Sequence, residues 1–189
     1  MNLAKYALNQ LDKRGRKKII TDRDGQEPYL ERYYLLWNDR YHRKNQNIPF
    51  NAFLHRFVQS DDPVFHNHPW TWYRTIILKG GYWEHTPWGT KWMGPGSTKL
   101  VQGGKLVPFP HHFNYEPEIN KIHKVEWANV YADLHYVEVP KPGETWTLFI
   151  RGPNVREWGF TPDPYRGTWI PQDIYLSTHR KHERVMNNE

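Results

Sequence analysis

The chain has 189 residues, no cysteine, and 26 basic against 20 acidic side chains, for a formal net charge of +6. This length suits one domain or two small ones, and the lack of cysteine excludes a disulfide framework and a thiolate metal site. No apolar run approaches the roughly 20 residues that cross a membrane, and aromatic residues make up 16% of the chain, which argues against disorder. We therefore expect a soluble, cytoplasmic protein.

The positive charge is concentrated in residues 1–18. This segment carries six basic residues against Asp12, a net of +5, and the remaining 171 residues are left with +1. The spacing of Leu3, Tyr6, Ala7 and Leu11 predicts a short helix. We interpret residues 1–18 as a basic N-terminal extension that is solvated by default, and contact of this arm with nucleic acid is the less favoured alternative.

From residue 19 onward, short apolar and aromatic runs alternate with turn residues, a pattern typical of antiparallel β sandwiches and barrels. The expected strands are 29–36, 52–58, 72–78, 82–86, 121–127, 134–139 and 146–151. The Gly80-Gly81 pair between two of them predicts a tight β-hairpin, because glycine accepts positive φ. Residues 19–170 should form the barrel, and residues 171–189 a tail or a short appended helix.

The chemical signal is concentrated in His66 and His68. Residues i and i+2 of a strand point to the same face, and two neutral imidazoles on one face can share a metal ion such as Zn, Fe, Ni or Cu. A His-x-His pair is common by chance. This one follows an apolar strand and an acidic turn and precedes the predicted hairpin, so it predicts a metal site.

The run HNHPWTWYRTIILKG, residues 66–80, resembles the first motif of the cupin superfamily, in which His-x-His is followed by Glu, an apolar triplet and a glycine. Segments 53–57, 123–126 and 156–160 are similar to uncharacterised cupin-like proteins of tailed phages. The resemblance implies an all-β, cupin-type double-stranded β-helix (a jelly-roll barrel) with a short N-terminal helical extension and a metal at its mouth. It also implies the host cytoplasm as location if the protein is phage-encoded, and it leaves a homodimer open.

One residue departs from the cupin motif, since Tyr73 stands where many cupins have a metal-binding Glu. A phenol with a pKa near 10 is a poor ligand at neutral pH, so the site would consist of histidines alone. Tyr73 is then a candidate catalytic residue that donates a proton or a hydrogen bond. The resemblance places a third ligand in the second cupin motif. We assign it to His123, with His111 and His112 as alternatives.

Three neutral histidines leave coordination positions open, as catalytic metal sites do, and the set is similar to that of the thiol dioxygenases. We therefore predict a divalent-metal-binding cupin that is a small-molecule metalloenzyme, most specifically an Fe(II)-dependent dioxygenase on a small polar or anionic substrate. Zn, Mn and Ni are the alternative ions. The alternative functions are a non-oxidative cupin, such as a sugar or sugar-nucleotide isomerase, and a non-catalytic ligand-binding or structural module.

His55 and Trp72 are the predicted substrate-binding residues. Strand alternation sends only one of His55 and Arg56 inward, and His55 shares its face with Phe53. Trp72 belongs to a group of tryptophans that form either a stacking platform or the barrel core. The predicted hairpin register places Glu84 roughly 13 Å from Tyr73, so we expect Glu84 in a salt bridge rather than on the metal.

Overall fold

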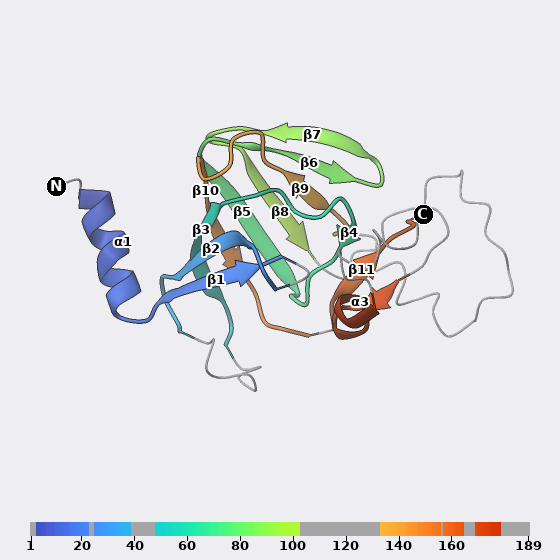
Figure 1. Cartoon of the computed structure of the whole chain (residues 1–189), viewed down its shortest axis with the longest axis horizontal. Coiled ribbons are helices and arrows are strands. Elements are labelled where there is room, and N and C mark those ends of the chain that lie inside the picture. Colours follow the sequence, from blue (N-terminus) through green and yellow to red (C-terminus); the bar gives the residue numbers. More distant parts are fainter. Residues whose placement is uncertain are drawn as a thin grey trace, which may run out of the picture.

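A computed structural model describes residues 3–22, 25–38, 48–102, 133–155, 157–164 and 169–178. Strands predominate in these residues, and the helices among them are α1 (Leu3–Lys13) and α3 (Gln172–Thr178) (Figure 1). The all-β class predicted from the sequence is confirmed. No helix in the described ranges combines the length and the apolar character that a membrane crossing requires.

The largest element is a six-stranded sheet with the order β1-β2-β3-β10-β5-β8, in which every pairing is antiparallel. Its strands are β1 (Lys17–Thr21), β2 (Pro28–Tyr34), β3 (Asn51–Phe57), β5 (Trp72–Lys79), β8 (Thr98–Gln102) and β10 (Thr145–Arg151). Buried and half-buried residues alternate strictly along β3 and β10, as expected for strands with one face turned to a core.

Two three-stranded sheets complete the barrel, with the orders β12-β11-β4 and β7-β6-β9. Their strands are β4 (Phe65–His66), β6 (Tyr82–Thr86), β7 (Gly89–Met93), β9 (Tyr136–Glu138), β11 (Gly159–Thr161) and β12 (Ile170–Pro171). The chain passes repeatedly between the large sheet (β3, β5, β8, β10) and the small ones (β4, β6, β9, β11) (Figure 1). This winding is that of a jelly roll, as the cupin resemblance implied.

The barrel interior holds two apolar clusters. The first joins the large sheet to the β7-β6-β9 sheet and consists of Leu30, Phe57, Ile77, Tyr82, Met93, Val137 and Val139. The second lies on the large sheet and consists of Tyr34, Phe53, Tyr73, Val101 and Phe149. The second cluster provides the aromatic wall beside which the candidate site is built.

Five of the expected strands correspond to β2, β3, β5, β6 and β10, and expected strand 134–139 is shorter, as β9. Expected strand 121–127 lies outside the described residues. The sequence patterns did not single out β1, β4, β7, β8, β11 or β12. These strands are five residues or fewer, so they offer too few alternations for a period of two to be visible.

Gly80 and Gly81 do not form the predicted hairpin. β5 pairs with β10 and β8, whereas β6 pairs with β7 and β9, so the two glycines form a corner where the chain changes sheets. Gly80 has φ +72°, and a Cβ there would lie 2.8 Å from Thr145 Oγ1. Positive φ and close packing explain the glycine, but they do not distinguish a corner from a hairpin, because that choice depends on distant partner strands.

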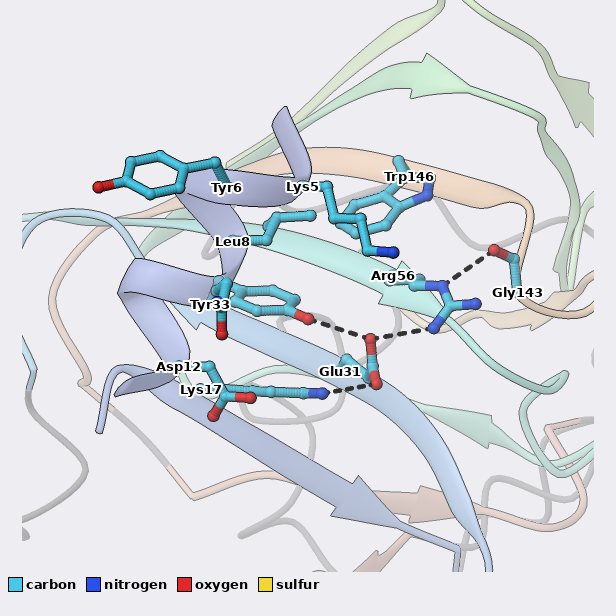
Figure 2. Close-up of a pocket in the computed structure, with 11 residues that line it drawn as sticks. Lys5, Tyr6, Leu8, Asp12, Lys17, Glu31, Tyr33, Arg56, Gly143 and Trp146 are labelled. Atoms are coloured by element: carbon cyan, nitrogen blue, oxygen red, sulfur yellow. Dashed lines mark hydrogen bonds and ion pairs between the residues drawn. The ribbon is translucent and has the colours of Figure 1, made fainter. Parts of the chain in front are cut away.

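The predicted N-terminal helix is present as α1, and none of its residues is buried. Figure 2 shows the outer sheet surface near it, where Glu31 is the centre of a charge cluster. Glu31 accepts hydrogen bonds from Lys17 at 2.8 Å, from the Tyr33 hydroxyl at 3.2 Å and from Arg56 at 3.3 Å. Burial opposes the charge of Glu31, but the two cations lower its pKa overall. Part of the basic arm is thus paired with the sheet.

Candidate metal centre

Three histidines from two distant segments meet in the described part of the chain. His66 ends β4, His68 follows two residues later, and His135 directly precedes β9. Their ring centroids lie 5.0–5.3 Å apart. One ligand nitrogen of each ring lies within 4.8 Å of those of the other two. Imidazole nitrogen is a common ligand of divalent transition metals, so the three side chains can hold one ion between them.

Local hydrogen bonds determine where the rings lie. His66 and His135 face each other in an antiparallel bridge, and each backbone N–H donates to the other's carbonyl oxygen at 3.0 Å. Asn67 is fully buried, and its Oδ1 accepts a hydrogen bond from the Gly159 N–H at 2.7 Å. The His-x-His segment is therefore held against β11 on one side and against the chain before β9 on the other.

All three imidazoles are kept neutral, chiefly because burial disfavours the charged form. The pKa of His66 is lowered to about 3 by burial and then by its proximity to His135. The pKa of His68 lies well below its ordinary value, first through burial and then through His135 and His66. Burial also lowers the pKa of His135, although Glu84 opposes that effect. Neutral imidazoles carry the lone pair that a metal requires, so the donor set fits a divalent cation.

Two carboxylates lie against the histidines, one at the His135 ring and one at the His68 backbone. Glu84 Oε1 lies 3.2 Å from His135 Nδ1 and 2.6 Å from Lys99 Nζ, and Asp133 Oδ2 accepts a hydrogen bond from the His68 backbone N–H at 3.1 Å. Burial opposes the ionisation of Glu84, but His135 and the Lys99 ammonium outweigh it, and the pKa of Glu84 falls to about 2. A carboxylate at Nδ1 fixes the tautomer of His135 and leaves Nε2 for a metal, an arrangement common at metal sites.

Tyr73 lies at the edge of the histidine cluster. Its side chain is buried, and its hydroxyl is 3.2 Å from His135 Nδ1. Its ring is 4.7 Å from the His68 ring and stacks on Phe149 at 5.3 Å. The hydroxyl is thus placed against one of the candidate ligands, and the catalytic role of Tyr73 stays a prediction.

The histidines open onto a cavity of about 480 Å³ that is lined by residues of all three sheets. Trp70 stacks on His68 at 5.0 Å, and Trp158 lies 6.4 Å from His66. Pockets for small molecules in proteins are of this size, apolar over most of their wall and equipped with a few polar groups. The charged residues in this wall include Arg32, Asp61, Glu84 and Lys99. The cavity therefore suits a small molecule that carries polar or charged groups.

Of the predicted ligands, His66 and His68 belong to the cluster, whereas His123 and its alternatives His111 and His112 lie outside the described residues. His135 was not singled out from the sequence. A signal for it was present in the expected strand 134–139, where alternation places His135 on the same face as Val137 and Val139. Those three side chains are all buried in the structure.

The structure places the two predicted substrate-binding residues differently. His55 points inward, is 4% exposed and lines the cavity, whereas Arg56 lies on the outer face. The indole of Trp72 packs against Gly152, and Trp70 and Trp158 are the tryptophans among the cavity-lining residues described. A role in substrate binding stays a prediction for both His55 and Trp72.

Glu84 makes the salt bridge that the sequence analysis expected, with Lys99 at 2.6 Å. Its position differs from the expectation. The sequence analysis placed Glu84 roughly 13 Å from Tyr73 on the basis of a hairpin register, and that register does not occur in the structure. The corner at Gly80 and Gly81 instead turns β6 so that Glu84 is buried and lies beside His135.

Comparison with protein-family models and with curated proteins yields no match. Comparison with solved structures yields partial similarities. KdgF from Halomonas sp. is 12% identical with a TM-score of 0.41, over 69% of this chain and 85% of that one. A sugar phosphate isomerase from Silicibacter pomeroyi is 12% identical with a TM-score of 0.41, over 78% and 74%. Ectoine synthase from P. lautus is 11% identical with a TM-score of 0.39, over 77% and 76%. At this level of similarity, the interpretation of the site rests on the residues of this chain.

Proposed function

We propose that this protein binds one divalent metal ion through His66, His68 and His135 and acts as a small-molecule metalloenzyme. The observation that supports this most directly is the convergence of three neutral imidazoles, with ligand nitrogens within 4.8 Å of one another. In this proposal His135 takes the place that the sequence analysis gave to His123. The three nitrogens leave further coordination positions open, which distinguishes a catalytic centre from a closed structural one.

The ion that we favour is Fe(II), with Zn, Mn or Ni as alternatives, and the reaction is a dioxygenation of a small polar or anionic molecule. When bound, Fe(II) would supply the one-electron chemistry that O₂ requires and a positive charge that polarises the substrate. The remaining roles belong to side chains of the protein. Glu84 holds a proton on His135 Nδ1, the Tyr73 hydroxyl lies 3.2 Å from the same atom, and the Trp70 ring stacks on His68.

Metal analysis of variants tests the ligand set. We expect His68→Ala and His135→Ala each to lower the metal content of the purified protein several-fold. His85→Ala is the matched control, because His85 pairs with Glu138 at 2.9 Å and does not belong to the cluster. If His135→Ala retains the parent's metal and His123→Ala loses it, the third ligand is the one predicted from the sequence and our assignment is wrong.

The identity of the metal and the use of O₂ test the reaction. Iron together with substrate-dependent O₂ uptake supports the dioxygenase. Zn or Mn together with turnover of a sugar or sugar nucleotide, and no O₂ uptake, would replace it with a non-oxidative enzyme. A protein that folds normally, takes up no metal and loses partner binding when residues 1–18 are removed would instead be a binding module.

A further inference from the structure

The pairing of β2 with β3 separates two arginines into different environments. In this register Glu31 lies opposite Arg56, and Arg32 lies opposite His55. The first pair is on the outer face of the sheet, where Arg56 binds the Glu31 carboxylate at 3.3 Å (Figure 2). The second pair faces the cavity that holds the three histidines. The outer arginine is therefore neutralised by a carboxylate, whereas its inner counterpart faces an imidazole.

Arg32 is oriented by its neighbours but not neutralised by them. Its Nε donates a hydrogen bond to His55 Nε2 at 3.0 Å, and its guanidinium carbon lies 4.9 Å from the centroid of the Phe53 ring. His55 is neutral, because burial and the charge of Arg32 hold the pKa of its ring well below the ordinary value. Among the described residues, no carboxylate forms an ion pair with Arg32. The terminal nitrogens of the guanidinium are thus available to a ligand.

Other charged groups in the cavity wall have protein partners. Lys99 is bound to Glu84 at 2.6 Å, and Asp61 accepts a hydrogen bond from the Val137 N–H at 2.9 Å. Lys18, which lies opposite Arg32 in the β1–β2 pairing, is exposed at the cavity, and the acidic residues Asp22 and Asp62 line the same cavity. A charged side chain in a partly buried position is costly unless an opposite charge meets it. An anionic ligand would remove that cost.

Arg32 and the three histidines line the same cavity. The Phe149 ring lies between His68 and the partner of Arg32, since its centroid is 6.3 Å from that of His68 and 5.1 Å from that of His55. The planar fork of a guanidinium matches a carboxylate in two parallel hydrogen bonds. A single guanidinium also balances the single charge of a carboxylate rather than the double charge of a phosphate.

We propose that Arg32 anchors a carboxylate of the substrate, while the other end of the molecule reaches the three histidines. The substrate class is thus a small carboxylic acid with a second polar group several bonds away, and His55 is the positioning residue that orients Arg32. The part of this proposal that concerns the histidine end rests on the proposed function.

Binding to metal-free protein isolates the Arg32 anchor from metal chemistry. Succinate, its neutral diamide and inorganic phosphate are titrated at constant ionic strength into the EDTA-treated full-length chain. Binding is followed by calorimetry and by NMR of ¹⁵N-labelled arginine side chains. We expect succinate to bind more tightly than the diamide and to shift the Nε–H signal of Arg32. The signal of Arg74 serves as the internal reference, because this exposed side chain bonds Thr98 Oγ1 at 3.3 Å.

The affinities of Arg32 variants for succinate measure how much the guanidinium contributes to binding. Arg32→Met should lower the affinity for succinate about tenfold or more, as expected when a charged hydrogen-bonding group is lost. Arg32→Lys, which keeps the charge but not the fork, should bind with intermediate affinity. Arg74→Met should bind like the parent. If Arg32→Met fails to fold, the comparison of Arg32→Lys with the parent and the Arg32 signal in the parent decide the matter.

Three results would overturn the carboxylate anchor: equal affinity of the parent and Arg32→Met for succinate, no preference of the parent for succinate over the diamide, or tighter binding of phosphate than of succinate. None of them depends on a bound metal. A failure of the anchor is therefore distinguishable from a failure of the metal proposal, which the metal content of His135→Ala tests separately.

Discussion

Asp61 is an acidic group whose ionisation the fold opposes. Its Oδ2 accepts a hydrogen bond from the Val137 N–H at 2.9 Å, and its side chain lines the inner cavity. Burial raises its pKa from 3.8 to about 7, the Val137 hydrogen bond opposes the shift, and the charge of Asp62 adds to it. We predict that Asp61→Asn, which keeps the shape and an acceptor for the Val137 N–H, stabilises the protein at alkaline pH.

The sign and size of this effect follow from linkage. Between pH 3.8 and about 7 the folded protein holds a proton on Asp61 that the unfolded chain has released. The contribution of Asp61 to the stability of the parent therefore falls as pH rises through this range, and it levels off above it. At about 1.36 kcal/mol per pKa unit, the full cost above pH 7 is at most about 4 kcal/mol. Solvent that reaches the half-buried Asp61 side chain reduces this energetic cost. We expect the advantage of Asp61→Asn to grow by roughly 1.5–3 kcal/mol from about pH 5 to about pH 8.

Urea denaturation of the metal-free protein, followed by tryptophan fluorescence at both pH values, gives this difference. The histidines that are kept neutral in the folded protein take up protons in the unfolded chain within this range, but they do so in parent and variant alike, so their contribution cancels when the two are compared. Glu144→Gln is the control for a simple loss of negative charge, because Glu144 is exposed. If the stability curves of parent and Asp61→Asn run parallel between the two pH values, then Asp61 is ionised in the fold at no cost and the reasoning is refuted.

Two further predictions concern the histidine cluster. Glu84→Gln should weaken metal binding about 10- to 100-fold, because a neutral amide lacks the negative charge that stabilises the proton on His135 Nδ1. Competition with a chromophoric chelator measures the metal affinity, and an unchanged affinity would contradict the supporting role of Glu84. Tyr73→Phe should keep the metal but lower the turnover of any substrate that the O₂-uptake assay identifies, because the hydroxyl beside His135 is lost. Loss of metal from this variant would instead make the phenol a ligand.

Much of the barrel could be predicted from local patterns. β3 and β10 alternate buried and half-buried residues over seven positions each, and the expected strands 52–58 and 146–151 differ from them by one residue at most at either end. The corner at Gly80-Gly81 shows where such reasoning stops. A glycine pair marks a change of direction, but the pairing partners of β5 and β6 lie in other parts of the chain.

The candidate site likewise has one part that local sequence predicts and one part that it does not. His66 and His68 are two residues apart, so their shared face follows from the geometry of the local backbone. His135 is 69 positions from His66, and the two meet only because their backbones form a bridge. The His-x-His pair thus predicted a metal site, whereas choosing its third member among several downstream histidines required knowledge of which segments lie side by side.

The amino-acid sequence by itself determined the β character of the chain, the inward face of strands such as β3 and the presence of a histidine pair, because each depends on residues only one or two positions apart. The tertiary structure alone decided that His135 completes the cluster, that Glu84 stands behind it, and that Arg32 faces His55 and not a carboxylate. Those relations depend on sheet pairing and register. A register shift of one residue would turn Arg32 to the outer face, and no local pattern encodes the choice.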